Sequence, residues 1–344
     1  MTYGLARMRS SPPNPRQVNL VLEVALLVCL ASGLASWIVP TASARPFTFV
    51  HATSAIVTVV LAPRKYRGSI QRGFARRRAG RWVSALFGVM IVGAVVFGTV
   101  HSTGLWHGVG SWSPLWIHLA LGFGSIPLFG WHVATRPVRP RAGDMDRRAF
   151  LTIGAASVTS VAAVGVVEVV VRAVGGSGRR RAGTGSFEVA AFDPERLPVV
   201  SWIDDRIPSD TSPIGWPITV DGRRVTVDRL ASLTSPLVAE LDCTGGWRSP
   251  HRWDMVALST LVDGGGFRSV VVSSATGYAR RFGRRDLDRV FLCTGYDGVP
   301  LRPGNGGPLR VVAPGRRGPW WVKWVTTIEL SDRPAWLQLP LPPT

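Results

Sequence analysis

The sequence predicts two domains of different class, an α-helical membrane domain of about five transmembrane helices followed by an α+β domain that is mainly β. Three observations support this prediction. Apolar stretches of about 20 residues, the length that crosses a bilayer, recur up to residue 174. Short apolar or alternating runs between turn residues replace them after residue 186. The basic excess lies with the apolar half, because residues 1–175 hold 18 Lys and Arg against 4 Asp and Glu.

The composition excludes several classes of protein. Hydrophobic residues make up 46% of the 344 and charged residues only 18%, which fits neither a disordered chain nor a purely soluble enzyme; the net charge is +19. The basic runs lie between apolar spans, so they predict arginine-rich membrane loops and no nucleic-acid partner. The three cysteines predict neither a disulfide framework nor a structural zinc site. Cys243 and Cys293 could pair with each other in an extracytoplasmic domain.

Five apolar stretches are the candidate spans. They cover residues 18–39, 46–62, 82–100, 114–134 and 150–174. The loops after the second and fourth stretches are rich in arginine, whereas residues 41–45 and 101–113 are nearly uncharged. The positive-inside rule places basic loops in the cytoplasm. The sequence therefore predicts a multi-pass protein of the cell membrane whose C-terminal domain is extracytoplasmic.

The domain boundaries follow from these shifts in composition. The predicted parts are a cytoplasmic tail at residues 1–17, a four-helix domain at 18–134, a basic loop and fifth helix at 135–174, a linker at 175–186 and the extracytoplasmic domain at 187–344. The glycine-rich linker is predicted to be flexible. Residues 146–151, Asp-Arg-Arg-Ala-Phe-Leu, resemble a twin-arginine export signal, and two ordinary positive-inside arginines are the alternative.

The last domain is predicted to be built from short strands. Strand-like runs occur at residues 218–220, 224–227, 238–241, 269–273, 290–292, 309–312 and 322–330. Asp-Gly pairs at Asp221 and Asp297 predict hairpin turns. One helix is expected near residues 255–262.

Histidines in the apolar half predict a redox cofactor. His51 and His118 lie four or five residues from the outer ends of their spans, which a helical rise of about 1.5 Å per residue places at similar depth. Neutral imidazole is a common axial ligand of haem iron. The pair therefore predicts one haem b near the outer face, with His101 as the alternative partner. Interfacial histidines within an aromatic belt are the other interpretation.

One cysteine stands out in the polar half. Cys243 ends the strand-like run at 238–242 and precedes Thr-Gly-Gly-Trp. A thiol at a strand end, beside glycines that allow close approach to the backbone, suits a metal ligand or a nucleophile. A buried structural cysteine is the alternative that the spacing leaves open.

A family resemblance covers about a third of the chain, at residues 217–330. Its segments are Trp-Pro-Ile-Thr-Val-Asp-Gly from Trp216, Leu-Asp-Cys-Thr-Gly-Gly-Trp from Leu241, Gly-Tyr from Gly277, Gly-Val-Pro-Leu from Gly298, Asn-Gly-Gly-Pro-Leu-Arg-Val-Val-Ala-Pro from Asn305, Gly318, and Val-Lys-Trp from Val322. This series resembles the molybdopterin-binding domain of the sulfite oxidase family. The dimerisation domain of true sulfite oxidases does not follow it, so the chain looks more like the periplasmic methionine sulfoxide reductase branch, fused to a cytochrome-b-like membrane domain.

The resemblance implies a sulfite-oxidase-like fold in which the Cys243 thiolate binds molybdenum. A thiolate is a soft donor that suits a redox-active metal of this kind. It implies that Arg248 faces an anionic substrate and that Tyr278 lies near the reacting centre. The residues it assigns to cofactor binding are Gly245, Gly246, His251, Arg252, Gly306, Gly307, Arg310 and Lys323.

These observations predict a membrane-anchored, molybdopterin-dependent oxidoreductase. It would perform two-electron or oxygen-atom transfer on a small substrate and exchange electrons with a b haem, the quinone pool or a redox partner protein. The alternative is a non-catalytic binding or sensor module with an empty or degenerate pterin pocket. Trp253-Asp254-Met255 favours this alternative, because the family usually has a Trp-x-Gly turn there.

Overall fold

The computed structural model describes residues 15–109, 112–145, 147–201, 205–263 and 265–341. Most of the predicted N-terminal tail and Asp146 of the twin-arginine-like segment lie outside the described residues. Contacts divide the chain into two units. The helical unit comprises Met1–Leu34 and Phe47–Gly176, and the sheet unit comprises Ala35–Pro46 and Ser177–Thr344.

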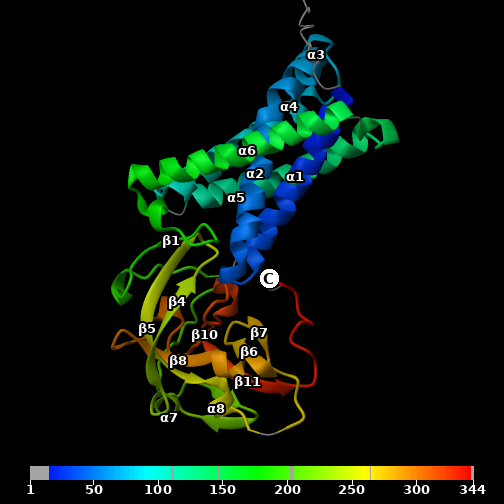
Figure 1. Ribbon diagram of the computed structural model, residues 1–344. Coiled ribbons are helices and arrows are strands. Elements are labelled where there is room, and N and C mark those ends of the chain that lie inside the picture. Colours follow the sequence, from blue (N-terminus) through cyan, green and yellow to red (C-terminus); the bar gives the residue numbers. More distant parts are fainter. Residues whose placement is uncertain (1–14, 110–111, 146, 202–204, 264, 342–344) are drawn as a thin grey trace, which may run out of the picture. The chain divides into compact units, whose positions relative to one another are not determined.

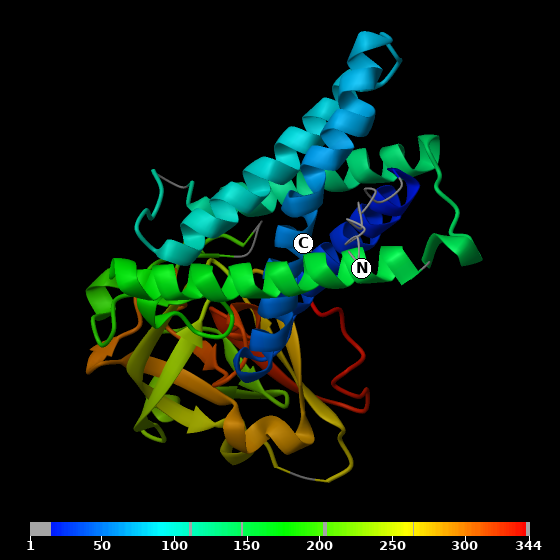
Figure 2. The same cartoon turned by 45° about the horizontal axis from the view of Figure 1, so that its top comes forward.

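Five long helices form the helical unit (Figure 1). They are α1 (Pro15–Ile38), α2 (Ala44–Lys65), α4 (Arg81–Thr103), α5 (Pro114–Thr135) and α6 (Arg147–Val174). Each contains a segment long and apolar enough to cross a membrane. The five predicted spans are thus confirmed as helices. In Figure 2, α2 runs on through η2 (Tyr66–Ile70) and α3 (Gln71–Ala75) before the chain turns back into α4.

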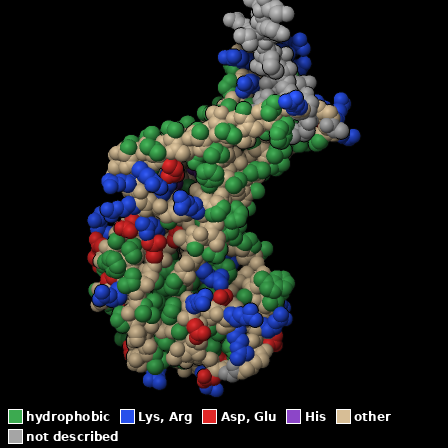
Figure 3. Space-filling view, viewed as in Figure 1, with side chains coloured by type: hydrophobic (Ala, Val, Ile, Leu, Met, Phe, Trp, Pro, Cys, Tyr) green, Lys and Arg blue, Asp and Glu red, His purple; other side chains and the backbone are tan. Residues whose placement is uncertain are grey.

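The surface of the long helices is mostly hydrophobic. Figure 3 shows hydrophobic side chains over most of their length, with Lys and Arg towards their ends. Val89, Val158 and Val166 are each more than 60% exposed. A helix that is apolar on its outer side needs a hydrocarbon environment or a partner. The five helices are therefore consistent with a membrane protein.

Glycines bring α4 and α5 close together. A Cβ at Gly93 would lie 2.9 Å from Leu121 Cδ1, and one at Gly124 would lie 2.8 Å from Met90 Cε. A Cβ at Gly98 would likewise lie 2.9 Å from His118 Nδ1. Small residues at a helix interface allow this close approach in membrane proteins.

Two sheets form the sheet unit (Figure 1). The first runs β1-β5-β8-β10, with β4 paired to β5 and β9 to β8; the second runs β3-β2-β11-β6-β7. The strands of the first sheet are β1 (Phe187–Glu188), β4 (Ser235–Asp242), β5 (Trp247–Ala257), β8 (Phe291–Tyr296), β9 (Val299–Pro300) and β10 (Arg310–Val312). Those of the second are β2 (Ile218–Val220), β3 (Arg223–Val225), β6 (Ser269–Ser274), β7 (Ala279–Gly283) and β11 (Val325–Ser331).

Every strand-like run predicted from the sequence contributes to one of these strands. The two Asp-Gly turns are also confirmed, since Asp221 and Asp297 both have positive φ and connect β2 to β3 and β8 to β9. The strand-like runs did not include β1, β5, β7 or β9. The expected helix near residues 255–262 is reduced to α8 (Leu258–Leu261), because β5 extends to Ala257.

The glycine-rich segment at 175–186 differs from the flexible linker that the sequence predicted. Ser177–Arg180 form a 3-10 turn, and Ser186 is fully buried. The hydroxyl groups of Thr184 and Ser186 both donate to the Asp242 carboxylate. These buried contacts place the segment from Ser177 onwards in the sheet unit.

Candidate functional site

The β4–β5 turn positions Cys243. β4 ends at Asp242 and β5 begins at Trp247, and the Cys243 amide donates to the Trp247 carbonyl over 2.8 Å. The Gly246 amide donates back to the Cys243 carbonyl over 3.1 Å. Gly246 has a φ of +86°, which side-chain-bearing residues rarely adopt, so glycine is required here.

The Cys243 thiol is held in a buried, partly cationic environment. Cys243 is 7% exposed, and the Gly245 amide donates to its Sγ over 3.3 Å. Burial raises the pKa of the Cys243 thiol above its ordinary value, while the Gly245 amide, Arg317 and Lys323 act in the opposite direction. A thiol of this kind keeps its proton until a cation replaces it, which is how metal binding releases protons.

Cys243 opens into a narrow cavity of about 70 Å³. Among the residues that line it are Cys243, Tyr278, Asn305, Arg310, Trp321 and Lys323. Gly306 packs behind two of them, since a Cβ there would lie 2.9 Å from Lys323 Cγ and 3.1 Å from Arg310 Cβ. The cysteine turn and the segment from Asn305 therefore meet, as the resemblance implied.

Arg310 and Lys323 bring two buried positive charges to this cavity. Arg310 is 2% exposed and donates to the Asn305 carbonyl over 2.7 Å, while its Nε has no hydrogen-bond partner among the described residues. Lys323 Nζ donates to the carbonyls of Val200 and Gly304, over 2.8 and 2.6 Å. Both basic groups also lie over tryptophan rings, and Asp205 is the one carboxylate among the described lining residues. This environment favours an anionic group.

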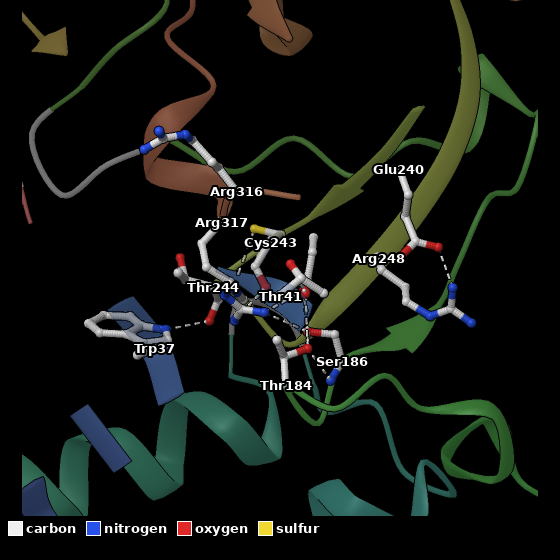
Figure 4. Close-up of polar contacts among 12 residues, drawn as sticks. Trp37, Thr41, Thr184, Ser186, Glu240, Cys243, Thr244, Arg248, Arg316 and Arg317 are labelled. Atoms are coloured by element: carbon white, nitrogen blue, oxygen red, sulfur yellow. Dashed lines mark hydrogen bonds and ion pairs between the residues drawn. The ribbon is translucent and has the colours of Figure 1, made fainter. Parts of the chain in front are cut away.

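A buried ion pair supports the turn from behind (Figure 4). Arg317 Nη1 donates to Asp242 Oδ1 over 2.5 Å, and both side chains are less than 5% exposed. Arg317 Nη2 also lies 3.4 Å from the Cys243 carbonyl. The Ser186 hydroxyl donates to the same Asp242 Oδ1 over 2.7 Å. These bonds fix the Asp242 side chain and the Cys243 carbonyl.

The segment Ala35–Pro46 contributes to the same network. Thr41 Oγ1 donates to Asp242 Oδ2 over 2.9 Å, beside Thr184 Oγ1 at 3.0 Å. The Trp37 indole donates to the Thr244 carbonyl over 2.9 Å, as Figure 4 shows. Sequence reasoning missed Asp242, Arg317 and this segment. The position of Asp242 directly before the cysteine was the only local signal.

Among the predicted residues, the four glycines at 245, 246, 306 and 307 belong to the loops around the cavity without lining it, and three predicted side chains lie away from it. Arg248 pairs with Glu240 and Glu188, on the other side of β5 from Trp247. Arg252 is exposed on that same side, because side chains alternate along a strand. His251 is fully buried between Asp297 and Ser249, which occupy its two ring nitrogens. Its surroundings are those of a core histidine.

The remaining predicted residues are accounted for as follows. Tyr278 lines the cavity and donates from its hydroxyl to the Pro319 carbonyl. Gly307 lies against the Leu301 carbonyl and precedes a cis proline. Cys243 and Cys293 are both free thiols, and Cys293 is fully buried in the core, so the two do not pair.

His51 and His118 meet inside the helical unit. Their ring centroids lie 5.7 Å apart at 88°. His51 Nδ1 lies 2.8 Å from the Cys29 carbonyl, and His118 Nδ1 lies 2.7 Å from the Ala94 carbonyl. A carbonyl only accepts, so each Nδ1 carries the proton and each Nε2 keeps its lone pair. His101 lies in the last turn of α4.

We expect the cofactor-free sheet unit to become more stable as the pH rises from about 7 to about 9. Burial lowers the pKa of Lys323 from 10.5 to about 7. Between these two values the unfolded chain holds a proton that the folded chain has released, so stability increases with pH. Thermal unfolding of the full chain and of Lys323→Met across this range measures the effect. Equal pH slopes in the two proteins would contradict it.

Comparison with known proteins adds an independent finding. Residues 206–337 match the family model of the oxidoreductase molybdopterin binding domain. A nitrate reductase (NADPH) of Mycosarcoma maydis is 46% identical over 50 residues, which are 14% of this chain and 5% of that protein. The sulfane dehydrogenase SoxCD of Paracoccus pantotrophus is a structural neighbour with 22% identity and a TM-score of 0.34, covering 36% of this chain and 40% of that chain.

Proposed function

We propose that this molybdopterin oxidoreductase is anchored in the cell membrane and acts on a small substrate at an extracytoplasmic molybdenum centre held by Cys243. The observation that carries the proposal is the buried Cys243 thiol, which shares one cavity with Arg310 and Lys323. When bound, the cofactor would supply a metal that exchanges two electrons or an oxygen atom with the substrate.

The donor set fits this cofactor. A thiolate is a soft ligand that suits molybdenum, and two buried cations suit the phosphate of a pterin. The unpartnered Nε of Arg310 is a free donor in this position.

Tyr278 is the proposed partner of the substrate. Its side chain lines the cavity beside Cys243, and burial raises the pKa of its hydroxyl to about 12, so the group keeps its proton at neutral pH. The hydroxyl now donates this proton to the Pro319 carbonyl, so it would have to turn from that carbonyl to donate to the substrate. Arg248 is not proposed for this role, because Glu188 and Glu240 already pair with its guanidinium.

The helical unit would connect the site to the membrane electron pool. Five apolar helices support a multi-pass anchor, and the basic loops support an extracytoplasmic sheet unit. His51 and His118 have the tautomer that leaves Nε2 free for iron, so we propose them as ligands of one b haem. A quinone or a redox partner protein would then exchange electrons with it.

Elemental analysis of the detergent-purified chain tests both metals together. We expect about one molybdenum and about one iron per chain. His51→Ala and His118→Ala should lose the iron and the haem absorbance while keeping the molybdenum. His107→Ala, in the loop before α5, is the matched control and should keep both. Loss of iron in His101→Ala but not in His118→Ala would assign the second ligand to His101, and absence of molybdenum would refute the proposal.

A further inference from the structure

A second cavity lies within the helical unit, at the end of the bundle where η2 and α3 follow α2. Its volume is about 500 Å³, which is the size of a small-molecule pocket. Residues of α1, α2, α4 and α5 line it together with η2 and α3. All of these belong to the helical unit, so the cavity is separate from the Cys243 site.

The lining combines positive charge with hydrocarbon. Of the described lining residues, Glu23 is the only one with a carboxylate. Six basic side chains line the cavity: Lys65, Arg72, Arg76, Arg78, Arg81 and Arg136. Much of the remaining wall is apolar and includes Leu26, Val59 and Phe87. Six positive charges around one cavity repel one another, so an anion bound among them is favoured.

Among the described residues, three polar side chains of the lining have no hydrogen bond or ion pair with a carboxylate. His132 is 9% exposed, and its buried Nδ1 has no hydrogen-bond partner among the described residues. Lys65 Nζ donates to the neutral Asn19 Oδ1 over 2.6 Å, and Arg136 Nη1 donates to the hydroxyl of Ser84 over 3.2 Å. A buried nitrogen without a partner, beside cations with neutral partners, indicates a place for an oxygen-rich anionic ligand.

We propose that this cavity binds the phosphate head of an anionic phospholipid, with an acyl chain along the apolar wall. The inference goes beyond the redox function and rests only on the membrane location proposed above. A zwitterionic headgroup has no net charge, and its ammonium would lie near the basic cluster, so the cavity should prefer lipids with net negative charge. A neutral quinone would leave the same cluster uncompensated.

Native mass spectrometry of the full chain in detergent tests the proposal. The chain is titrated with phosphatidylglycerol, with phosphatidylcholine, and with phosphatidylglycerol in the presence of inorganic phosphate or a long-chain quinone. Lys65→Gln/Arg136→Gln removes two charges from the cavity. Arg64→Gln/Arg67→Gln removes two charges from the same basic region, at residues that do not line the cavity. We expect phosphatidylglycerol to bind the first variant at least about tenfold more weakly and the second as it binds the unchanged chain.

Several results would overturn this assignment. Equal binding of phosphatidylcholine would mean that charge does not select the lipid. Equal weakening in the two variants would mean diffuse attraction to the basic end of the bundle. Displacement by the quinone would make the cavity a quinone site. Displacement by inorganic phosphate would keep a phosphate site and refute the lipid. Molybdenum content should not change in either variant, so a failure here is distinguishable from a failure of the proposed redox centre.

Discussion

Cys243→Ser is expected to purify without molybdenum, with its fold intact. The substitution replaces a soft thiolate by a hard hydroxyl oxygen, which is a poor donor for this metal and keeps its proton at neutral pH. The turn itself depends on the backbone hydrogen bonds between Cys243, Gly246 and Trp247, which serine retains. Molybdenum per chain, measured after expression in a host that makes the cofactor, should fall from about one to background.

Cys293→Ser is the matched control for this substitution. Cys293 is also fully buried, but its Sγ donates to the Gly295 carbonyl over 3.0 Å in the core, and a serine hydroxyl can do the same. This variant should keep its molybdenum. If both variants keep the metal, Cys243 is not the ligand. If both lose it, the effect is on folding, and thermal unfolding of the two variants will show this.

Arg317→Met is expected to destabilise the sheet unit by about 3–5 kcal/mol, the usual effect of removing one partner of a buried ion pair. Methionine has a similar volume, but it leaves the buried Asp242 carboxylate with hydroxyl donors only. Asp242→Asn/Arg317→Met should recover part of the loss, because no uncompensated charge remains. The free energies of unfolding of both variants measure this, and a double variant that is no more stable than Arg317→Met would contradict it.

The adjacent arginine provides the control. Arg316 pairs with Asp286 over 2.8 Å, but both side chains are more than a quarter exposed. Exposed pairs contribute about 0–1 kcal/mol. Arg316→Met should therefore have a small effect. A loss as large as that of Arg317→Met would mean that burial of the Asp242 pair is not the cause.

The helical unit was predictable from sequence because its determinant is local. A run of apolar residues long enough to span a bilayer is visible without knowledge of its neighbours. The sheet unit was harder, and β5 shows why. Its inward positions include Ser249 and His251, whose polar groups bond to Val189 and to Asp297. Since these partners lie 46 residues or more away in sequence, the alternation of apolar and polar residues that marks a strand is hidden.

In the candidate site, too, the residues with a local sequence signal could be predicted and those placed by distant contacts could not. Cys243, Arg310 and Lys323 could be proposed because each lies in a segment that resembles a known family. Arg248 was assigned from the same resemblance, at its position after the cysteine, but a position along an unrecognised strand does not reveal which face a side chain occupies. The contact of Asp242 with Thr41 spans 201 residues, and no local pattern indicates it.

The sheet unit is built from two separate segments of the chain, which limits how the helices between them can cross a bilayer. Ala35–Pro46 and Ser177–Thr344 share one folded body, so both must reach the same aqueous compartment. Four candidate spans, α2, α4, α5 and α6, lie between them. Only an even number of crossings returns a chain to its starting compartment. If any one of these four helices lay flat on the surface while the others crossed, Thr41 and Asp242 would be on opposite sides of the lipid.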